Sequence, residues 1–532
     1  MLSLESARRI THVARCMTAP TEESHGVAAD EAPARPMLLH SLWTSLRPQA
    51  VLWLITLAAG ILRFYGVGDW PVFIDEDDYT STALEMLHLP WREAILRSSQ
   101  VHPYKPPLGF LLQDWLIPLT TDPVVAGRVL SAAAGTITAA LCFFLGRRLG
   151  GPGVGLVAAA LYALSPVAVL HERMVLQDGP MAACALGAVL VSWAAIERRS
   201  WPLGGVAALL GALAVQFKVP AVATALLPIV ILAVHEGPRA RPLGPALLAA
   251  GGPLISYTAL MRGPLGSGLA QENSERLAEP FTAFRSNLDV LLDSALTYFP
   301  AGLAFVVLVG AVLALWHRPR LAAVFLSAII AWSAPWLVFS NFAPSRYYLP
   351  AVPYACALAA LAMIRLPVMA TSLGRAPGRL LAAGSLAILA ASGIGSVQLV
   401  VSHRTAAMPK VDDAQYRSGW ASGYGYAEAA YFVSTEAEPG SAVAYVVDPL
   451  HRVGVGFGRP SPTGVKILGF FHPPDQLRMN YRGPVYVVAD DGLDTVAGRK
   501  VAEVLAREPG LHTLVRYTRP GSDMGVSVLR RP

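Results

Sequence analysis

The amino-acid sequence predicts a multi-pass α-helical membrane protein that carries a small α/β domain near its C-terminal end. Of 532 residues, 54% are hydrophobic and 15% are charged, and the mean hydropathy is +0.46, outside the usual range of soluble proteins. Apolar runs recur up to residue 401, and beyond residue 402 the hydropathy falls and short strand-like runs replace them. The composition therefore excludes a soluble enzyme.

About eleven apolar runs have the length, or nearly the length, of a transmembrane helix. They lie at 50–66, 124–145, 153–170, 180–196, 202–217, 220–235, 244–262, 296–316, 321–340, 346–365 and 379–401. If the N-terminus is cytoplasmic, every second loop is basic, as cytoplasmic loops are. The basic pairs are Arg147 with Arg148, Arg198 with Arg199, Arg239 with Arg241, Arg318 with Arg320, and Arg375 with Arg379. A single span over 202–235 is the alternative, and it would move every later loop to the opposite side.

Three regions follow from this pattern. Residues 1–45 lack the apolar core of a cleavable signal and are expected to form a disordered cytoplasmic tail. Residues 46–401 form the transmembrane domain, with an outer loop at 67–123, and 402–532 form an extracytoplasmic α/β domain. We expect an integral protein of a prokaryotic plasma membrane. Strands are predicted at Ala442–Val447, Val465–Phe470, Val485–Ala489, Thr513–Tyr517 and Gly525–Leu529.

The acidic run that contains Asp75 and Glu76 follows the first apolar segment closely. Four successive acids cost too much to enter hydrocarbon, so they must lie at the water interface. An enzyme that uses a lipid-borne substrate needs a base at that depth. The alternative interpretation is a solvated acidic loop.

A second polar segment runs from His102 to Gly109 and contains Lys105. Flanking prolines fix the backbone there, so the ammonium group is held near the bilayer surface, where a cation suits a lipid phosphate. A lysine that snorkels to the interface is the alternative.

Two further segments place charges on the same predicted face. Asp178 precedes Gly179 and Pro180 at a helix start, which also allows it a simple capping role. Lys218 and Arg346 end apolar runs, where they could also serve as anchors to lipid headgroups.

Taken in order, these segments resemble the GT-C-type polyprenyl-phosphate-sugar glycosyltransferases, above all the protein O-mannosyltransferase and aminoarabinose transferase families. The resemblance covers about residues 50–365. Its motifs are Asp75-Glu76, Lys105-Pro106-Pro107-Leu108, Arg173 through Asp178-Gly179-Pro180, and Arg346-Tyr347-Tyr348-Leu349-Pro350. The chain departs from the usual pattern at Asp77-Asp78, which is more acidic, and at Gln177, where apolar residues are commoner.

The resemblance implies a GT-C-like fold and an inverting transfer of a sugar from a polyprenyl-phosphate donor to an acceptor hydroxyl at the outer face. Asp75 would be the base, and Lys105, Lys218 and Arg346 would stabilise the departing phosphate. Glu76 and Asp178 would position hydroxyl groups or tune Asp75. The complete set of substrate-binding candidates is His102, Lys105, Arg173, Lys218, Arg346 and Tyr347.

The expected partners are the donor, a lipid bilayer and an acceptor that is a protein, a lipid or a polysaccharide, with no nucleic acid. No cofactor is predicted, because the spacing of the histidines and carboxylates matches no diagnostic metal site. The four cysteines have no paired spacing that would predict a disulfide.

A transporter or flippase of a lipid-linked sugar is the alternative function, although transporters place their charges at the bilayer midplane. A receptor-like display of the C-terminal domain would leave the Asp75 segment unexplained.

Overall fold

The computed structural model describes residues 35–102, 105–236, 242–268, 270–271, 281–299, 302–447, 465–470, 481–493, 501, 505 and 509–532, without the side chains of 35–47, 235–236 and 469–470. Tertiary contacts divide the chain into the units Met1–Gln49 and Ala50–Pro532, and all the candidate site residues belong to the second. Of the predicted tail, residues 1–34 lie outside the described residues, and 35–45 form the first part of a helix.

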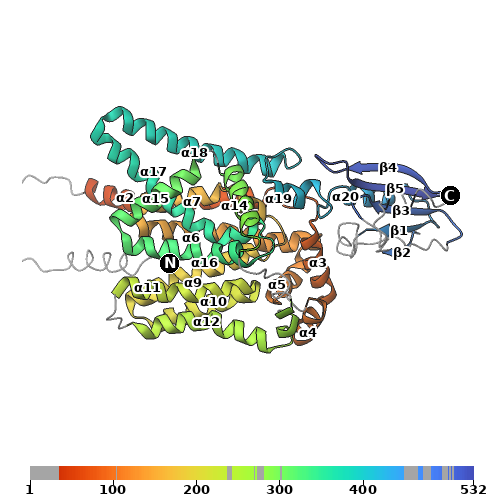
Figure 1. The fold of residues 1–532 in the computed structure, drawn as a ribbon, viewed down its shortest axis with the longest axis horizontal. Coiled ribbons are helices and arrows are strands. Elements are labelled where there is room, and N and C mark those ends of the chain that lie inside the picture. Colours follow the sequence, from red (N-terminus) through yellow and green to blue (C-terminus); the bar gives the residue numbers. More distant parts are fainter. Residues whose placement is uncertain are drawn as a thin grey trace, which may run out of the picture. The chain divides into compact units, whose positions relative to one another are not determined.

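Helices make up the larger part of the structure (Figure 1). In chain order they are α2 (Arg35–Phe64), α3 (Ile74–Met86), α4 (Trp91–Val101), α5 (Leu108–Leu116), η1 (Ile117–Leu119), α6 (Pro123–Gly150), α7 (Pro152–Ala163), α8 (Pro166–His171), α9 (Asp178–Arg198), α10 (Trp201–Phe217), η2 (Val219–Ala225), α11 (Leu226–Glu236), α12 (Leu243–Arg262), α14 (Phe284–Tyr298), α15 (Leu303–His317), α16 (Pro319–Phe339), η4 (Ser345–Ala351), α17 (Val352–Ala370), η5 (Thr371–Leu373), α18 (Arg375–Val401), α19 (Lys410–Asp413), η6 (Ala414–Ser418) and α20 (Tyr426–Glu436).

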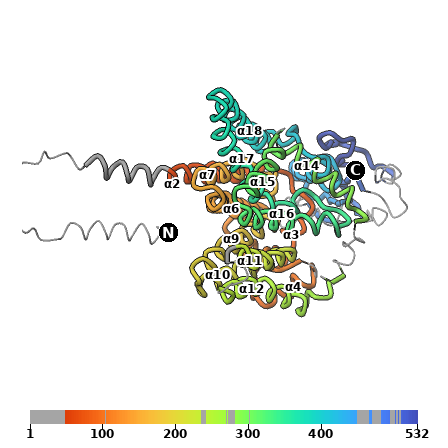
Figure 2. Tube along the Cα trace, turned by 60° about the vertical axis from the view of Figure 1, so that its left-hand side comes forward, coloured from red at the N-terminus to blue at the C-terminus, as the bar shows by residue number. Residues whose placement is uncertain are grey.

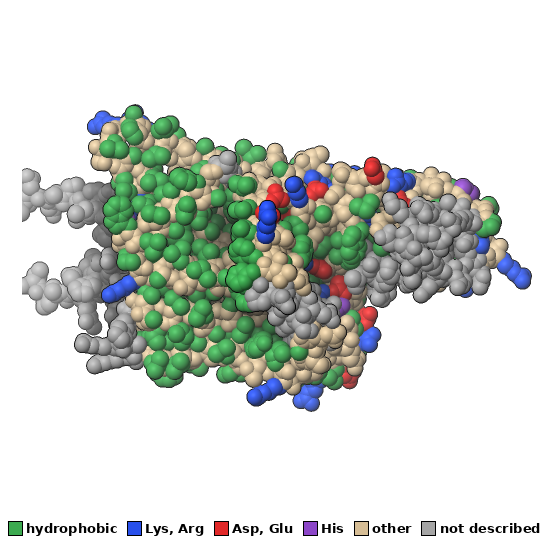
Figure 3. Space-filling model, in the orientation of Figure 1, with side chains coloured by type: hydrophobic (Ala, Val, Ile, Leu, Met, Phe, Trp, Pro, Cys, Tyr) green, Lys and Arg blue, Asp and Glu red, His purple; other side chains and the backbone are tan. Residues whose placement is uncertain are grey.

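The long helices pack in two groups (Figure 2). Helices α9, α10 and α12 pack on one another, helices α6, α7, α15 and α17 form the second group, and α6 also contacts α9. Large apolar side chains such as Trp53 of α2, Trp316 of α15 and Leu380 of α18 lie exposed. Figure 3 shows hydrophobic side chains over much of the helical surface, with few charged ones among them. A surface of this kind requires lipid rather than water.

Local sequence explains where the helices around the site begin and end. Asp122 caps α6 by accepting a hydrogen bond from the backbone amide of Val124 at 2.9 Å, and Pro123 takes the first helical position. Lys218 has an extended backbone, with φ −154° and ψ 126°, and ends α10. Residues 202–235 therefore do not form one continuous helix.

Within the described part of the chain, six helices are long and apolar enough to cross a membrane, or up to seven if the bent pair Phe284–Tyr298 and Leu303–His317 counts as one span. The predicted number of eleven is not confirmed. Several predicted spans correspond to shorter apolar helices, such as Pro152–Ala163 and Trp201–Phe217. Proline explains one of these shortenings, because Pro166 follows the end of α7 and opens the separate helix α8.

The C-terminal region forms a five-stranded sheet with the order β2-β1-β3-β5-β4. Strand β1 runs parallel to β2 and β3, whereas β5 runs antiparallel to β3 and β4. The strands are β1 (Ala442–Val446), β2 (Lys466–Phe470), β3 (Val485–Asp490), β4 (His512–Thr518) and β5 (Gly525–Arg531). All the predicted strands are present. Strands β1 and β3 are buried along their whole length, as their uninterrupted apolar sequences predict.

Candidate active site

The acidic run forms the first turn of helix α3 rather than a loop. Phe73 is the N-cap residue, and the Glu76 carboxylate accepts a hydrogen bond from the Phe73 backbone amide at 3.0 Å. Asp75, Glu76 and Asp77 all lie in the first turn, where the helix dipole favours negative charge. The helix start thus fixes in which direction each acid points.

Glu76 points into the protein and is fully buried. Arg128 of α6 donates to its two oxygens at 2.8 and 2.7 Å, and the backbone amide of Val175 donates to Oε1 at 2.7 Å. Arg128 also donates to the backbone carbonyls of Val67 and Trp70 at 3.0 and 2.8 Å. Glu76 therefore joins α3 to α6 and to the segment before α9, and its oxygens face those partners.

Asp75 lies beside Glu76 but keeps 32% of its side chain exposed. Its Oδ2 accepts a hydrogen bond from Arg346 Nη2 at 2.6 Å. The Arg346 guanidinium lies 5.5 Å from the centre of the Phe73 ring and 3.4 Å from the Tyr416 hydroxyl. Burial raises the pKa of Asp75, but the charges of Arg346 and Lys105 outweigh burial and hold the pKa below its usual value of 3.8. Asp75 is therefore ionised at neutral pH.

Asp78 is a site residue that the sequence prediction did not include. Its carboxylate accepts from His102 Nε2 at 2.8 Å and pairs with the Lys105 ammonium group. Lys105 also lies 4.3 Å from the centre of the Tyr79 ring. Burial raises the pKa of Asp78. The charge of Lys105 and the hydrogen bond from His102 outweigh burial, so the pKa lies below its usual value. Lys105 is thus held in place by one carboxylate and one ring.

Asp178 and Lys218 form a similar pair on the other helix group. Asp178 is the first residue of α9, and its Oδ1 lies 2.7 Å from Lys218 Nζ. The same ammonium group lies 4.2 Å from the centre of the Tyr347 ring, which is itself buried. Gln177 is the N-cap residue of α9, so Asp178 does not cap the helix and instead orients a cation.

The structure brings together three carboxylate–cation pairs from segments far apart in the sequence. In each pair the cation keeps a small exposed fraction, 10% for Arg346, 14% for Lys105 and 21% for Lys218. The pairs are Asp75 with Arg346, Asp78 with Lys105, and Asp178 with Lys218. These cations are largely buried, and at the exposed part of each another anion can replace the carboxylate.

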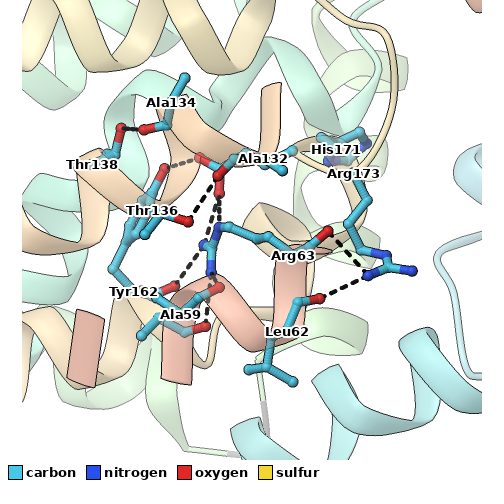
Figure 4. Close-up of polar contacts among 12 residues, drawn as sticks. Ala59, Leu62, Arg63, Ala132, Ala134, Thr136, Thr138, Tyr162, His171 and Arg173 are labelled. Atoms are coloured by element: carbon cyan, nitrogen blue, oxygen red, sulfur yellow. Dashed lines mark hydrogen bonds and ion pairs between the residues drawn. The ribbon is translucent and has the colours of Figure 1, made fainter. Parts of the chain in front are cut away.

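Arg63 and Tyr162 lie in a separate polar cluster inside the helical part (Figure 4), and Glu172 is their hydrogen-bond partner. Arg63 Nε donates to Glu172 Oε2 at 2.7 Å, and the Tyr162 hydroxyl donates to Glu172 Oε1 at 2.6 Å. Arg63 also donates to the backbone carbonyls of Ala59 and Ala163 at 3.1 and 3.2 Å. Both charged side chains are fully buried, and the cluster ties α2 to α7 and to the segment before α9.

Arg173, a predicted substrate ligand, reaches the end of α2 instead (Figure 4). Its Nη1 donates to the backbone carbonyls of Leu62 and Tyr65 at 2.9 and 2.7 Å, and its Nη2 donates to that of Gly66 at 2.9 Å. These carbonyls have no partner within the helix, so an arginine side chain satisfies them. The predicted ligands Lys105, Lys218 and Arg346 lie in the carboxylate–cation pairs, whereas Arg173 does not.

A fully buried carboxylate, Asp412, lies beyond the predicted domain boundary and still joins this region. The hydroxyl groups of Ser345 and Tyr298 donate to its Oδ2, and His171 Nε2 lies 3.8 Å from the same oxygen. Ser345 directly precedes Arg346, so Asp412 fixes the segment that carries the cation. The hydropathy of the sequence gave no signal for this role.

Two residues missed by the sequence analysis did leave a signal. Arg63 and Arg128 are each the only charged residue of an apolar run, 50–66 and 124–145, a position where a charge must find a partner. Among the described residues, no three His, Cys, Asp or Glu side chains are placed to hold a metal ion.

Residues 104–255 match the family model described as dolichyl-phosphate-mannose-protein mannosyltransferase. Among solved structures, ArnT from Cupriavidus metallidurans bound to undecaprenyl phosphate superposes with a TM-score of 0.52 and is 14% identical, covering 91% of this chain and 98% of that one. Its apo state superposes with a TM-score of 0.55, at 14% identity and 92% and 98% coverage. The chain therefore shares the fold of ArnT, a fold of the GT-C type.

The GT-C fold extends to a third structure, the oligosaccharyltransferase of Archaeoglobus fulgidus tethered to an acceptor peptide. It has a TM-score of 0.50 and 15% identity, over 85% of this chain and 70% of that one. No curated protein sequence matches the chain. The resemblance predicted from the sequence motifs is confirmed.

Proposed function

We propose that this protein is a membrane glycosyltransferase that moves a sugar from a polyprenyl-phosphate donor to an acceptor hydroxyl group, with inversion at the anomeric carbon. The observation that carries the proposal is the set of three largely buried carboxylate–cation pairs, Asp75 with Arg346, Asp78 with Lys105, and Asp178 with Lys218. The fold similarity to ArnT bound to undecaprenyl phosphate supports the class of donor.

In this proposal Lys105 and Lys218 bind the donor phosphate. Each is oriented by a carboxylate and by the face of a tyrosine, Tyr79 for Lys105 and Tyr347 for Lys218. When the bond between the anomeric carbon and the phosphate oxygen breaks, the electron pair stays on that oxygen. Fixed cations then stabilise the growing negative charge more in the transition state than in the bound substrate.

Asp75 is the proposed base. The acceptor oxygen forms a bond with the anomeric carbon from the face opposite the phosphate, and its proton passes to Asp75. Arg346 now lowers the pKa of Asp75. If a donor phosphate draws Arg346 away, Asp75 loses its cation and its pKa rises, so the base becomes stronger only when the donor is bound.

The remaining predicted residues support this arrangement. We propose that Asp178 and Tyr347 position Lys218, and that His102 positions Lys105 by sharing the carboxylate of Asp78. Glu76 and Arg173, in the catalytic and substrate-binding sets of the sequence prediction, are reassigned to holding the fold, because buried protein groups surround their charges. The acceptor, whether protein, lipid or polysaccharide, stays open.

Incubation of the purified full-length protein with a panel of polyprenyl-phosphate sugars tests this function. Release of polyprenyl phosphate is the readout. Asp75→Asn keeps the shape of the side chain and removes its basicity, and we expect turnover to fall by about a hundredfold to ten-thousandfold. Donor binding should largely survive.

Glu197→Gln is the matched control, because it removes an exposed carboxylate that pairs with Arg148 away from the site. Near wild-type turnover in Asp75→Asn would remove Asp75 from the role of base. Transport of the donor across a bilayer without release of polyprenyl phosphate would instead indicate a flippase.

A further inference from the structure

A small cavity lies between α3, α5, α6 and the start of α9. Its empty volume, mouth included, is about 260 Å³. Most of its wall is apolar, and the polar side chains that line it are Tyr79, Gln113, Ser131 and Gln177. The space that the centre of a water-sized group can occupy inside it is about 20 Å³, which suits one small polar group such as a hydroxyl and excludes a lipid chain.

Gln177 differs from the other amide and hydroxyl groups of the wall. The Gln113 amide donates to Thr80 and to the backbone carbonyl of Pro123, and the Ser131 hydroxyl donates to the backbone carbonyl of Leu176. Gln177 is only 6% exposed, and its Nε2 has no partner among the described residues. Leaving a buried amide donor without an acceptor is unfavourable, so a ligand oxygen at this place would bind strongly.

The backbone is shaped to admit this amide. A Cβ atom at Gly109 of α5 would lie 2.3 Å from Gln177 Nε2, and one at Gly127 of α6 would lie 2.5 Å from Val175 Cγ1. Both distances are below contact, so a methyl group at either position would push the facing side chain aside. The two glycines thus make room for the Gln177 side chain and for the segment before α9.

Residues that contact or adjoin the two lysines proposed to bind the donor phosphate line the cavity. The ring of Tyr79, which lines it, carries Lys105 on its face, and Phe217, which also lines it, directly precedes Lys218. Asp75 does not line it. A group in the cavity therefore lies on the donor side of the site, next to the phosphate, which is where the sugar joined to that phosphate must be.

We infer that this cavity is a subsite for one oxygen-bearing substituent of the transferred sugar and that Gln177 selects it. The inference rests on the proposed function, and it names the specificity-determining residue. The Gln177 amide donates a hydrogen bond to a ring hydroxyl or carbonyl oxygen of the sugar. A sugar without that oxygen would leave the amide buried and unpaired, so the site discriminates against it.

The test compares the full-length wild type with Gln177→Met, which keeps the length of the side chain and removes its amide. The probes are undecaprenyl-phosphate mannose, arabinose and 4-amino-4-deoxyarabinose, followed by the monodeoxy analogues of the best donor. We expect kcat/KM for the best donor to fall by roughly tenfold to a hundredfold. For one monodeoxy analogue, the variant and the wild type should be equally active.

Two further variants separate selection from structure. Gly109→Ala should give the same donor-dependent loss as Gln177→Met, because the new methyl group displaces the amide without removing it. Ser131→Ala changes a wall group whose hydrogen bond is already made within the protein, and it should affect all donors alike.

An equal effect of Gln177→Met on every donor, or no effect at all, would overturn the inference while leaving the proposed function intact. A wild type that releases polyprenyl phosphate from none of the probes, while another donor class is turned over, would overturn both.

Discussion

Replacing Glu172 by Gln tests how strongly the buried cluster of Figure 4 supports the fold. Glu172 Oε2 lies 2.7 Å from both Nε and Nη2 of Arg63, and its Oε1 accepts a hydrogen bond from the Tyr162 hydroxyl at 2.6 Å. Neither charged side chain is exposed. Glutamine preserves the shape but leaves the guanidinium without a counter-charge. Breaking a buried ion pair in this way costs about 3 to 5 kcal/mol of unfolding free energy.

Unfolding of the purified protein in detergent micelles, followed by circular dichroism over a denaturant series, measures this loss. Glu197→Gln is the control, because its pair with Arg148 is 38% and 24% exposed and is expected to contribute no more than about 1 kcal/mol. The combined change of Arg63→Met, Glu172→Leu and Tyr162→Phe removes every charge of the cluster and should recover most of the lost stability. A loss in Glu172→Gln as small as the control would refute the reasoning.

Three other predictions concern the site and its surroundings. Lys105→Met keeps most of the apolar stem and should lower kcat/KM by roughly tenfold to a hundredfold, in turnover as well as in donor affinity; unchanged kinetics would favour the snorkelling interpretation. The pKa of Asp78 is lower in the folded than in the unfolded protein. Its pairing should therefore stabilise the protein at pH values above the unfolded pKa of about 3.9, and this stabilisation should be lost as pH falls through the folded pKa. Asp78→Asn should flatten this part of the plot of unfolding free energy against pH. In a cysteine-free background, exposed cysteines at Gln100 and Ser434 should both react with an impermeant thiol reagent in intact cells, whereas one at Ser372 should not, and any other pattern would show a miscounted span.

The sequence predicted which segments form the site because charge cannot enter hydrocarbon. Lys105, Lys218 and Arg346 each interrupt or end an apolar run, and the alternation of basic loops places them on one face. The structure indeed brings them into neighbouring pairs. The strands of the C-terminal sheet were predictable for a similar reason, since short apolar runs bounded by glycine and proline leave few other choices.

The individual pairings could not be predicted. Asp75 and Arg346 are 271 residues apart, so only the packing of the helices decides that they meet. The different environments of Asp75 and Glu76 follow from helical geometry, because adjacent residues of a helix point about 100° apart. One of them therefore faces Arg346 and the other Arg128. The sequence analysis treated the segment as a loop, in which no such difference is defined.

The predicted number of spans is not confirmed, and the reason is different. Hydropathy measures how apolar a run is, but helix length also depends on where prolines and extended residues stop the hydrogen bonding. Lys218 ends α10, and Pro166 opens the separate helix α8 just after α7 has ended. Both breaks lie inside a largely apolar stretch of sequence.

The segment that follows α18 determines where this chain can be cut. The backbone carbonyl of Ala421 accepts a hydrogen bond from Ile74 at 3.1 Å, and a Cβ at Gly423 would lie 2.2 Å from the carbonyl oxygen of Val72. A truncated or chimeric protein joined at residue 402, where hydropathy falls, would lose Asp412 and Tyr416. It would also lose the residues, Ala421 and Gly423, that pack against the start of α3. A junction placed after residue 425 would exchange the sheet and keep every group that holds Arg346 in place.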